Sequence, residues 1–311
     1  MKVPIRVVLW QADFPTWLPY MYSGVTMTLV RGFEAAEGVS ALRSGVGVRR
    51  NASKAFRNSV SWLRKGDVFL WIGVNHGLAP WAELRRRGVR SVAYQTEPTH
   101  SCEGLHRAQV DELWDFSWHN IEACAGMKSA PASLRYVPLG ALDSPRASAV
   151  ASARPKLMFF GAPYHGQGRR HCFSDLKQRM RETLKYTYRV WDDGAFVNRV
   201  LSHFTIFLNL HKDCGDSHNP VTFRVAKLLN AEGLVLSERC HPRDEAEYAG
   251  MVLFVNDTAS IVSTHTQLVQ SGSWRARAQE AAARFQQRFQ PRAIFERAGI
   301  YRSFGLSGAD G

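Results

Sequence analysis

Short apolar runs, rich in β-branched and aromatic residues, alternate along the chain with stretches whose apolar positions recur at helical spacing. This alternation is typical of parallel sheets with helices on both faces. In the first half it predicts strands at Ile5 to Trp10, Val68 to Val74, Ser91 to Gln95, Glu112 to Phe116 and Leu134 to Val137. It also predicts helices over Ser23 to Glu37, Ser53 to Arg64 and Trp81 to Arg87.

A stretch of small residues then interrupts the pattern. Residues 141–155 have no apolar periodicity and contain Pro145 and Pro155, which is typical of an interdomain linker. The pattern restarts with strands predicted at Lys156 to Phe160, Tyr188 to Trp191, Thr205 to Leu210, Gly233 to Leu236 and Met251 to Val255. The helices predicted in this half are Arg169 to Leu184, Thr222 to Leu229 and Ser273 to Phe289.

We therefore predict an α/β protein of two Rossmann-like domains, which the length of 311 residues suits. The predicted boundaries are 1–140 for the N-terminal domain, 141–155 for the linker, 156–290 for the C-terminal domain and 291–311 for a tail. Because ligands of such sheets bind at the carboxyl ends of the strands, we expect the domains to face a central cleft. The amphipathic C-terminal helix over 273–289 is expected to pack across both domains.

The net charge and the cysteine pattern limit the classes of partner and the cellular compartment that are expected. The chain has 40 Lys and Arg against 27 Asp and Glu, a net charge of +13, which favours nucleic acid, a membrane surface or nucleoside diphosphates. No window holds the roughly 18 apolar residues that span a bilayer. The N-terminal apolar run is short and contains Arg6, so it predicts a strand rather than a signal peptide. The cysteines lack disulfide-scaffold spacing, which favours a reducing compartment, and we expect a cytoplasmic protein.

A glycine-rich loop opens the second domain. The predicted strand leads into Gly161, and Arg169 and Arg170 begin the helix that follows. Backbone N–H groups and the helix dipole make such a helix start an anion site, and the two arginines add positive charge where a diphosphate would lie. His171 stands where a dinucleotide fingerprint has its third glycine, so the motif argues against NAD. The alternative is a solvated, basic helix start.

Polar residues also end the next two predicted strands and occupy the helix between them: Asn209, His211, Arg224, Lys227, Ser237 and Glu238. Arg224 and Lys227 lie three apart on one helical face, from which either reaches a phosphate, arginine through two parallel hydrogen bonds. Glu238 ends a strand, which places its carboxylate to accept hydrogen bonds from two ribose hydroxyls. The alternative is an ordinary ion pair of Glu238 with Arg224 and Lys227.

The order of these motifs resembles a known family. In the second domain they are Phe159-Phe160-Gly161, Arg169-Arg170, Leu208-Asn209-Leu210-His211, Phe223-Arg224, Leu228-Leu229-Asn230 and Val235-Leu236-Ser237-Glu238. In the first domain they are Tyr94 to Pro98, Asp111 to Asn120 and Tyr136 to Gly140. Over residues 94–255 this set is similar to GT-B glycosyltransferases, and most to small bacterial and viral enzymes related to the GT4 group.

The resemblance implies the GT-B fold and a donor site built from Gly161, Arg169, Arg170, Asn209, His211, Arg224, Lys227, Ser237 and Glu238. It implies transfer of a sugar from a nucleotide-diphosphate sugar, with UDP or GDP, to a glycan or other hydroxyl acceptor. No metal or other cofactor is expected to be required. Positive charge has to stabilise the departing diphosphate, and the four basic residues of the set are the candidates.

An inverting enzyme also needs a base from the first domain to deprotonate the acceptor hydroxyl. Asp13, just after the first predicted strand, is the first candidate, and His76 and Glu97, at the ends of later strands, are its rivals. Many relatives carry a glutamate just before the Arg224 helix, where this chain has Val221, Thr222 and Phe223. Retention and inversion therefore both stay open.

Other groups of residues favour other functions. Asp192 and Asp193 fit the acidic metal motif of GT-A enzymes or a plain turn. A zinc site would draw on residues whose spacing matches no standard pattern: His211, Cys214, His218, Cys240 and His241.

A cluster of basic residues supports two further alternatives: Arg85, Arg86, Arg87, Arg90 and the basic C-terminal helix. It favours a non-enzymatic protein that binds nucleic acid or another polyanion, although no nucleic-acid module is recognised and no nucleic-acid partner is expected. Alternatively, it attaches the enzyme peripherally to an anionic membrane surface. A glycan-binding protein without catalysis is the remaining alternative.

Overall fold

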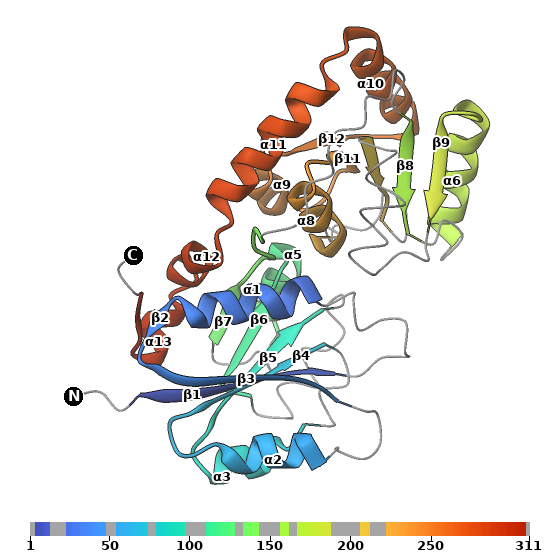
Figure 1. The fold of residues 1–311 in the computed structure, drawn as a ribbon. Helices are drawn as coiled ribbons and strands as arrows, with labels where there is room; N and C mark the ends of the chain where they lie inside the picture. The colour runs from blue at the N-terminus through green and yellow to red at the C-terminus, as the bar shows by residue number, and fades with distance from the viewer. Residues whose placement is uncertain are drawn as a thin grey trace. The chain divides into compact units, whose positions relative to one another are not determined.

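Two parallel β-sheets organise the chain, one in each of two α/β units (Figure 1). The first unit comprises Met1–Gly140 and Phe289–Gly311, and the second comprises Ala141–Arg288. The computed structural model describes residues 4–12, 23–47, 54–73, 79–96, 110–127, 133–142, 156–161, 167–187, 206–211 and 222–308. The two α/β sheets confirm the predicted fold class.

The first unit holds a six-stranded sheet in which each described pair of strands is parallel. The strand order is β3 (Val39–Gly47), β1 (Ile5–Ala12), β4 (Val68–Ile72), β5 (Arg90–Gln95), β6 (Glu112–Asp115) and β7 (Ser133–Tyr136). Every residue of β4 is buried. A central parallel strand is covered on both faces, which explains why this segment is an unbroken apolar run.

Helices cover both faces of this sheet (Figure 1). One face carries α2 (Lys54–Trp62) and α3 (Trp81–Arg86), and the other carries α1 (Ser23–Glu34), α12 (Pro291–Arg297) and α13 (Ile300–Phe304). Adjacent residues of β6 show the division, because successive side chains of a strand point to opposite faces. Leu113 belongs to one core cluster with Trp81, whereas the Trp114 ring lies 5.9 Å from the Phe295 ring of α12. The helix after β6 is α5 (Trp118–Ala125).

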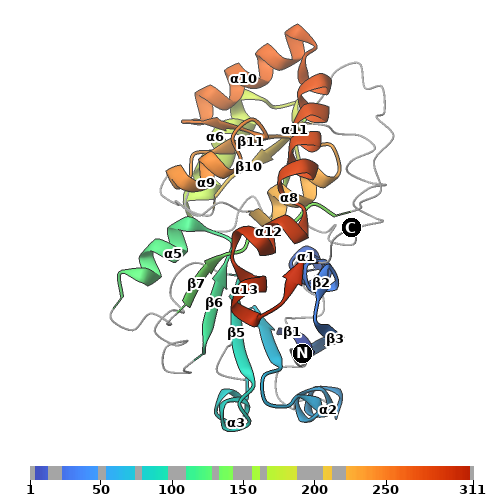
Figure 2. The ribbon, with the colours of Figure 1, turned by 90° about the vertical axis from the view of Figure 1, so that its left-hand side faces the viewer.

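The C-terminal segment belongs to the first unit. Figure 2 shows α12 and α13 beside α1, and β13 (Ser307–Gly308) pairs antiparallel with β2 (Ala36–Glu37). The residues expected as a tail, 291–311, are therefore part of the fold of this unit as far as they are described.

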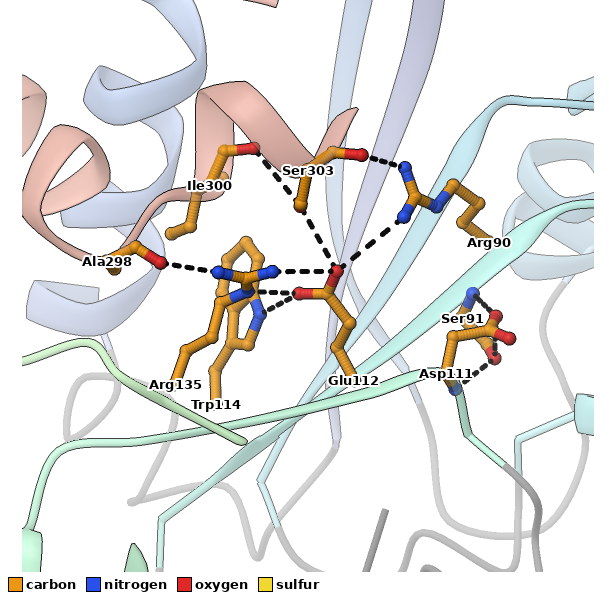
Figure 3. Close-up of polar contacts among 9 residues, drawn as sticks. All are labelled: Arg90, Ser91, Asp111, Glu112, Trp114, Arg135, Ala298, Ile300 and Ser303. Carbon is orange, nitrogen blue, oxygen red and sulfur yellow. Dashed lines mark hydrogen bonds and ion pairs between the residues drawn. The ribbon is translucent and has the colours of Figure 1, made fainter. Parts of the chain in front are cut away.

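A buried carboxylate anchors this segment to the amino-terminal edge of the sheet (Figure 3). Glu112 is 3% exposed and accepts from Arg135 Nε at 2.7 Å, from Trp114 Nε1 at 2.8 Å and from Ser303 Oγ at 3.1 Å. Arg135 also donates to the carbonyl of Ala298 at 2.6 Å. A buried charge is tolerated only when it is paired and hydrogen-bonded, and Glu112 meets both conditions.

The second unit holds a five-stranded parallel sheet in the order β12 (Val252–Val255), β11 (Leu234–Glu238), β10 (Ile206–Asn209), β8 (Leu157–Phe160) and β9 (Leu184–Thr187). On it, α8 (Thr222–Asn230) packs against α11 (Trp274–Arg288), and α6 (Gln167–Arg179) packs against α10 (Thr258–Ser271). The short helix α9 (Pro242–Glu247) joins β11 to β12. The carboxyl ends of β8, β10 and β11 lie at one edge, because these strands are parallel.

Several predicted boundaries are wrong. The helix predicted to reach Glu37 ends at Glu34, because Ala36 and Glu37 pair with β13 instead. The helix predicted to reach Leu184 ends at Arg179, and Leu184 begins β9; the strand predicted at 188–191 lies outside the described residues. The edge strand β3 and the helices α5, α9 and α10 were not predicted, because their apolar positions are too few to give a clear period.

The cysteines also differ from expectation. Cys124 and Cys172 are disulfide-bonded, and Cys240 is a buried free thiol. Spacing along the chain therefore failed to predict disulfide bonds, since pairing depends on which cysteines meet in space. In the described ranges, no helix has both the length and the apolar character needed to cross a bilayer.

Candidate active site

Polar residues gather at the point where the strand order of the second sheet reverses. The chain runs from β8 outward to β9, returns to β10 on the other side of β8, and continues to β11 and β12. Ligands of open α/β sheets bind at such a switch point, because the loops that follow the two neighbouring strands diverge there. Gly161 follows β8, and Asn209 and His211 lie at the end of β10.

Helix α8 brings a buried guanidinium to this edge. Arg224 Nη1 donates to Asn209 Oδ1 at 2.7 Å and to the carbonyl of Leu210 at 3.3 Å. The residue is 8% exposed, and its Nε has no hydrogen-bond partner within the part of the chain that the structure describes. Gly161 makes room for it: its φ is +153°, and a Cβ there would lie 2.8 Å from Arg224 Nη2. Close approach and backbone conformation thus both require glycine at this position.

A second buried guanidinium lies beside the first. Arg169, in the first turn of α6, donates from Nε to the carbonyl of His211 at 3.0 Å. Both guanidiniums lie over the Phe159 ring, at 5.8 Å for Arg169 and 5.1 Å for Arg224. Burial, and next the charge of Arg169, lower the pKa of Arg224 to about 9, so Arg224 is still a cation at neutral pH. Two neighbouring buried cations favour binding of an anion, which would offset their desolvation and mutual repulsion.

The end of β11 orients this arrangement. Asn209 pairs in register with Ser237, and its Nδ2 donates to Ser237 Oγ at 2.9 Å. That bond turns the Asn209 oxygen toward Arg224. Glu238 Oε2 accepts from the backbone N–H of His211 at 2.6 Å and lies 4.0 Å from His211 Nδ1. The ends of β10 and β11 are therefore joined to α6 and α8 by one chain of hydrogen bonds.

Most of the predicted donor residues lie in this buried cluster, and two are more exposed. The cluster contains Gly161, Arg169, Asn209, His211, Arg224, Ser237 and Glu238. Arg170 is exposed, and Lys227 is partly exposed. Arg224 donates to Asn209 and Leu210 rather than to Glu238, so the simple ion pair considered as an alternative is not what holds Arg224.

Two buried residues, each two positions before Gly161 or Arg224 in the sequence, were not predicted as donor residues. Phe159 supplies the ring under both guanidiniums, and Thr222 begins α8 as a fully buried residue. Thr222 Oγ1 has no hydrogen-bond partner among the described residues. The sequence signals were an aromatic residue close before the glycine loop and a hydroxyl at a helix start, but both are common in ordinary cores and helix ends.

The candidates for catalysis, Asp13, His76 and Glu97, lie outside the described residues, as do Asp192 and Asp193. Two members of the suggested zinc set, Cys214 and His218, also lie outside them. Within the described ranges, no three His, Cys, Asp or Glu side chains gather closely enough to hold a metal ion.

In the first unit, the motif from Asp111 to Asn120 forms a buried network. Asp115 is fully buried at the carboxyl end of β6 and accepts from the Ser117 backbone N–H at 2.8 Å. It also accepts from Asn120 Nδ2 at 3.0 and 3.1 Å. These bonds hold the start of α5 against the sheet, so this part of the motif is structural.

Two Rossmann-like units, the first completed by the C-terminal segment, define the GT-B fold. Three solved structures agree with this assignment over nearly the whole chain. The first is a lipopolysaccharide outer core galactosyltransferase, WaaB, in its apo form, with a TM-score of 0.59 and 10% identity. The match covers 96% of this chain and 99% of that one.

The second is the sucrose-phosphate synthase of Thermosynechococcus elongatus, with a TM-score of 0.63 and 11% identity over 97% of this chain and 99% of that one. The third is HepE of Anabaena in complex with UDP and glucose, with a TM-score of 0.64 and 9% identity over 96% and 99%. No family model and no curated protein matches the sequence. The chain therefore has the GT-B fold. Because the sequence identity to these structures is only 9–11%, the similarity extends to the fold alone.

Proposed function

We propose that this protein is a glycosyltransferase that moves a sugar from a nucleotide-diphosphate sugar to a hydroxyl of a glycan or other acceptor. The observation that carries the proposal is the pair of buried guanidiniums of Arg169 and Arg224 at the switch point of the second sheet. Such a pair suits a diphosphate, whose charge would offset the cost of burying both cations. Solved structures with the GT-B fold include a galactosyltransferase and a protein in complex with UDP and glucose, which supports the proposal.

The same pair would also assist the chemistry. As the bond between the sugar and the diphosphate breaks, negative charge grows on the leaving group, and preorganised cations stabilise it. Arg224 is held by Asn209 and Leu210, so it needs little reorganisation during the reaction. We propose that the guanidiniums take this role without a divalent metal, and that no other cofactor is required.

Glu238 is proposed to bind the nucleoside. Its carboxylate ends β11 and is held by the backbone N–H of His211, close to the two arginines. We propose that it accepts hydrogen bonds from ribose hydroxyls of a UDP or GDP donor. HepE, a solved structure of this fold, was determined with UDP and glucose, which makes UDP the first nucleotide to test.

The base for an inverting reaction is proposed among three residues of the first unit. Asp13 follows β1 directly in the sequence and is the first candidate, and His76 and Glu97 follow β4 and β5. A carboxylate or imidazole at such a position is suited to accept the proton of an acceptor hydroxyl.

A thermal-shift panel tests the donor site. UDP, GDP, CMP, ADP and TDP are each added to the purified protein, with and without Mg²⁺ and Mn²⁺. A nucleotide at a hundred times its dissociation constant stabilises the fold by about 2.7 kcal/mol, which is readily measured. We expect one nucleoside diphosphate to raise the melting temperature without metal, and the Glu238→Ala variant to lose that response.

Two controls show whether the Glu238→Ala effect is specific and whether nucleotide binding leads to sugar transfer. Glu280→Ala removes an exposed carboxylate of α11 and should leave the nucleotide response intact. Incubation of the responding nucleotide's sugar donors with candidate acceptors then separates transfer from binding. A shift that requires Mn²⁺ would direct attention to Asp192 and Asp193. The absence of any shift would overturn the proposed donor site.

A further inference from the structure

Five exposed basic residues gather in the first unit where α2 and α3 end: Arg43, Arg64, Lys65, Arg85 and Arg86, called the basic patch below. The turns after the two helices lie against each other, since Gly66 N–H donates to the carbonyl of Gly88 at 2.8 Å. A Cβ on Gly88 would lie 2.9 Å from Lys65 Cγ. Figure 1 shows α2 and α3 side by side on one face of the sheet.

The neighbouring charges leave this patch positive. Asp67, the nearest carboxylate in sequence, is buried and accepts from Arg6 Nε at 2.8 Å and from the Arg64 backbone N–H at 2.6 Å. Glu83 forms an ion pair with Arg87 at 3.5 Å. Asp67 and Glu83 thus both bind groups other than the patch side chains in the part of the chain that the structure describes.

The structure also separates this patch from the other basic residues of the region. Arg87 donates to the carbonyls of Val60 at 2.8 Å and Ser61 at 3.0 Å, so it holds the end of α2. Arg90 lies over the Phe304 ring at 4.5 Å and is 3.8 Å from Glu112, so it anchors the C-terminal segment. The five residues of the patch are exposed, whereas Arg87 and Arg90 are half-buried.

We propose that the basic patch docks the protein on an anionic membrane surface. Lysine and arginine side chains on turns reach a charged, laterally mobile layer of headgroups without needing a shaped pocket. The patch lies at the amino-terminal ends of β4 and β5, whereas ligands of such sheets bind at the carboxyl ends. Docking at the patch therefore leaves the ligand edge of this sheet open.

Single-stranded nucleic acid is a poorer fit. Such binding relies on exposed aromatic rings that stack with bases. The one aromatic residue against the patch is Trp62, among the described residues, and its ring already carries the guanidiniums of Arg43 at 4.0 Å and Arg6 at 4.9 Å. The large exposed hydrophobic residues in the described ranges, Met27 and Tyr186, belong to α1 and β9.

Vesicle flotation tests the proposal. The full-length protein is mixed with vesicles of phosphatidylcholine alone, or of phosphatidylcholine with phosphatidylglycerol, at low and physiological salt. The test variant carries Arg64→Ser, Lys65→Ser, Arg85→Ser and Arg86→Ser. The matched control carries four substitutions on exposed residues of the second unit, Lys177→Ser, Arg181→Ser, Lys185→Ser and Arg277→Ser, and loses the same charge. Circular dichroism melting verifies that both variants are folded.

We expect the unmodified protein to float only with the anionic vesicles and to dissociate as salt rises. Removing the four patch charges should lower its partitioning by roughly a thousandfold, whereas the control should stay within a few-fold. Equal losses in both variants, or no binding by the unmodified protein, would overturn the proposal. So would binding to a duplex DNA that is tighter than binding to anionic vesicles and lost in the same variant, since the patch would then recognise nucleic acid.

Discussion

Two buried charged residues, Glu112 and Arg224, show how differently this chain treats charge in its interior. Glu112 is surrounded by Arg135, Trp114 and Ser303, which satisfy its carboxylate within the first unit. Arg224 instead has two oxygen acceptors, a neighbouring cation in Arg169 and an Nε without a partner among the described residues. The carboxylate of Glu112 is therefore satisfied by the protein itself, whereas the surroundings of Arg224 favour binding of an anionic ligand.

This difference leads to a prediction for Arg224→Gln. The amide still donates to Asn209, and removing a desolvated charge offsets the lost hydrogen bonds, so the free energy of unfolding without ligand should change by only about 1 kcal/mol. The stabilisation by nucleoside diphosphate, about 2.7 kcal/mol at a hundred times the dissociation constant, should disappear. Thermal melting with and without nucleotide measures both quantities.

Arg243→Gln is the matched control, because Arg243 is exposed on α9. It should leave both quantities unchanged. A variant of Arg224 that keeps the full nucleotide response would contradict the assignment of this residue to the donor site.

At the scale of elements, α1 and α12 approach each other closely through a glycine. A Cβ on Gly32 would lie 2.3 Å from Phe295 Cε1, and Phe295 is fully buried. The ring also packs edge-on against Phe33, with centroids 5.0 Å apart, so it has little freedom to move away.

We therefore expect Gly32→Ala to destabilise the first unit by about 1–3 kcal/mol, although alanine is the better helix former by about 1 kcal/mol. Urea denaturation measures the change. Gly24→Ala in the same helix is the control, because its Cβ would meet only the tip of Leu139 at 3.3 Å and should cost less than about 0.5 kcal/mol. Equal effects of the two substitutions would refute the close-packing argument.

The contact of α13 with α1 should depend on pH. Tyr301 donates from its hydroxyl to the carbonyl of Gly32 at 2.7 Å, and burial, followed by the nearby charge of Glu296, raises the pKa of Tyr301 to about 12. The phenol ionises near pH 10 in the unfolded chain. Its contribution to stability is thus fully present below pH 10 and is lost as pH rises through 12.

Between pH 9 and pH 11, the unmodified protein should lose about 1 kcal/mol more stability than Tyr301→Phe, which has no phenol to ionise. At pH 9 the variant itself should be less stable by about 1 kcal/mol, because the hydrogen bond is missing. Denaturant titrations at the two pH values give both differences. Identical pH slopes in the two proteins would show that Tyr301 titrates normally.

At the scale of the whole molecule, the first unit is assembled from two separate parts of the sequence. Residues 289–311 supply Phe295, Phe304 and Ser303 to the face of the sheet that carries Trp114 and Glu112. Without them, buried aromatic surface and a buried carboxylate would both be exposed to water.

We expect a fragment of residues 1–140 to lack a cooperative thermal transition. The same fragment joined by a flexible linker to residues 289–311 should regain it, since the core and the partners of Glu112 are then complete. Circular dichroism melting compares the two. Cooperative unfolding of the shorter fragment would show that the C-terminal segment is dispensable.

The hydrophobic pattern along the sequence was enough to predict elements that are either buried throughout or clearly amphipathic. The buried run Val68–Ile72 could only be a central strand, and the helical spacing from Trp274 to Phe285 matched α11. The pattern failed for β3, an edge strand with several exposed residues, and for the pairing of Ala36 and Glu37 with β13, whose partner lies 270 residues away.

In the candidate site, too, some features could be predicted from the local sequence and others depend on contacts between distant residues. The sequence placed Asn209 and Ser237 at strand ends. It could not predict that the Asn209 amide orients Arg224, because that depends on the register of β10 with β11. Arg169 and Arg170 are equivalent in sequence, and only the packing of α6 buries the first and exposes the second.

By itself, the sequence determined the α/β class, the parallel sheets and the polar residues at the carboxyl ends of the second sheet, because these depend on spacing along short segments. The tertiary structure alone decided the return of the C-terminal segment to the first unit, the burial of Glu112 and the pairing of two guanidiniums over Phe159. Those features depend on contacts between residues far apart in the chain, and no local pattern encodes such contacts.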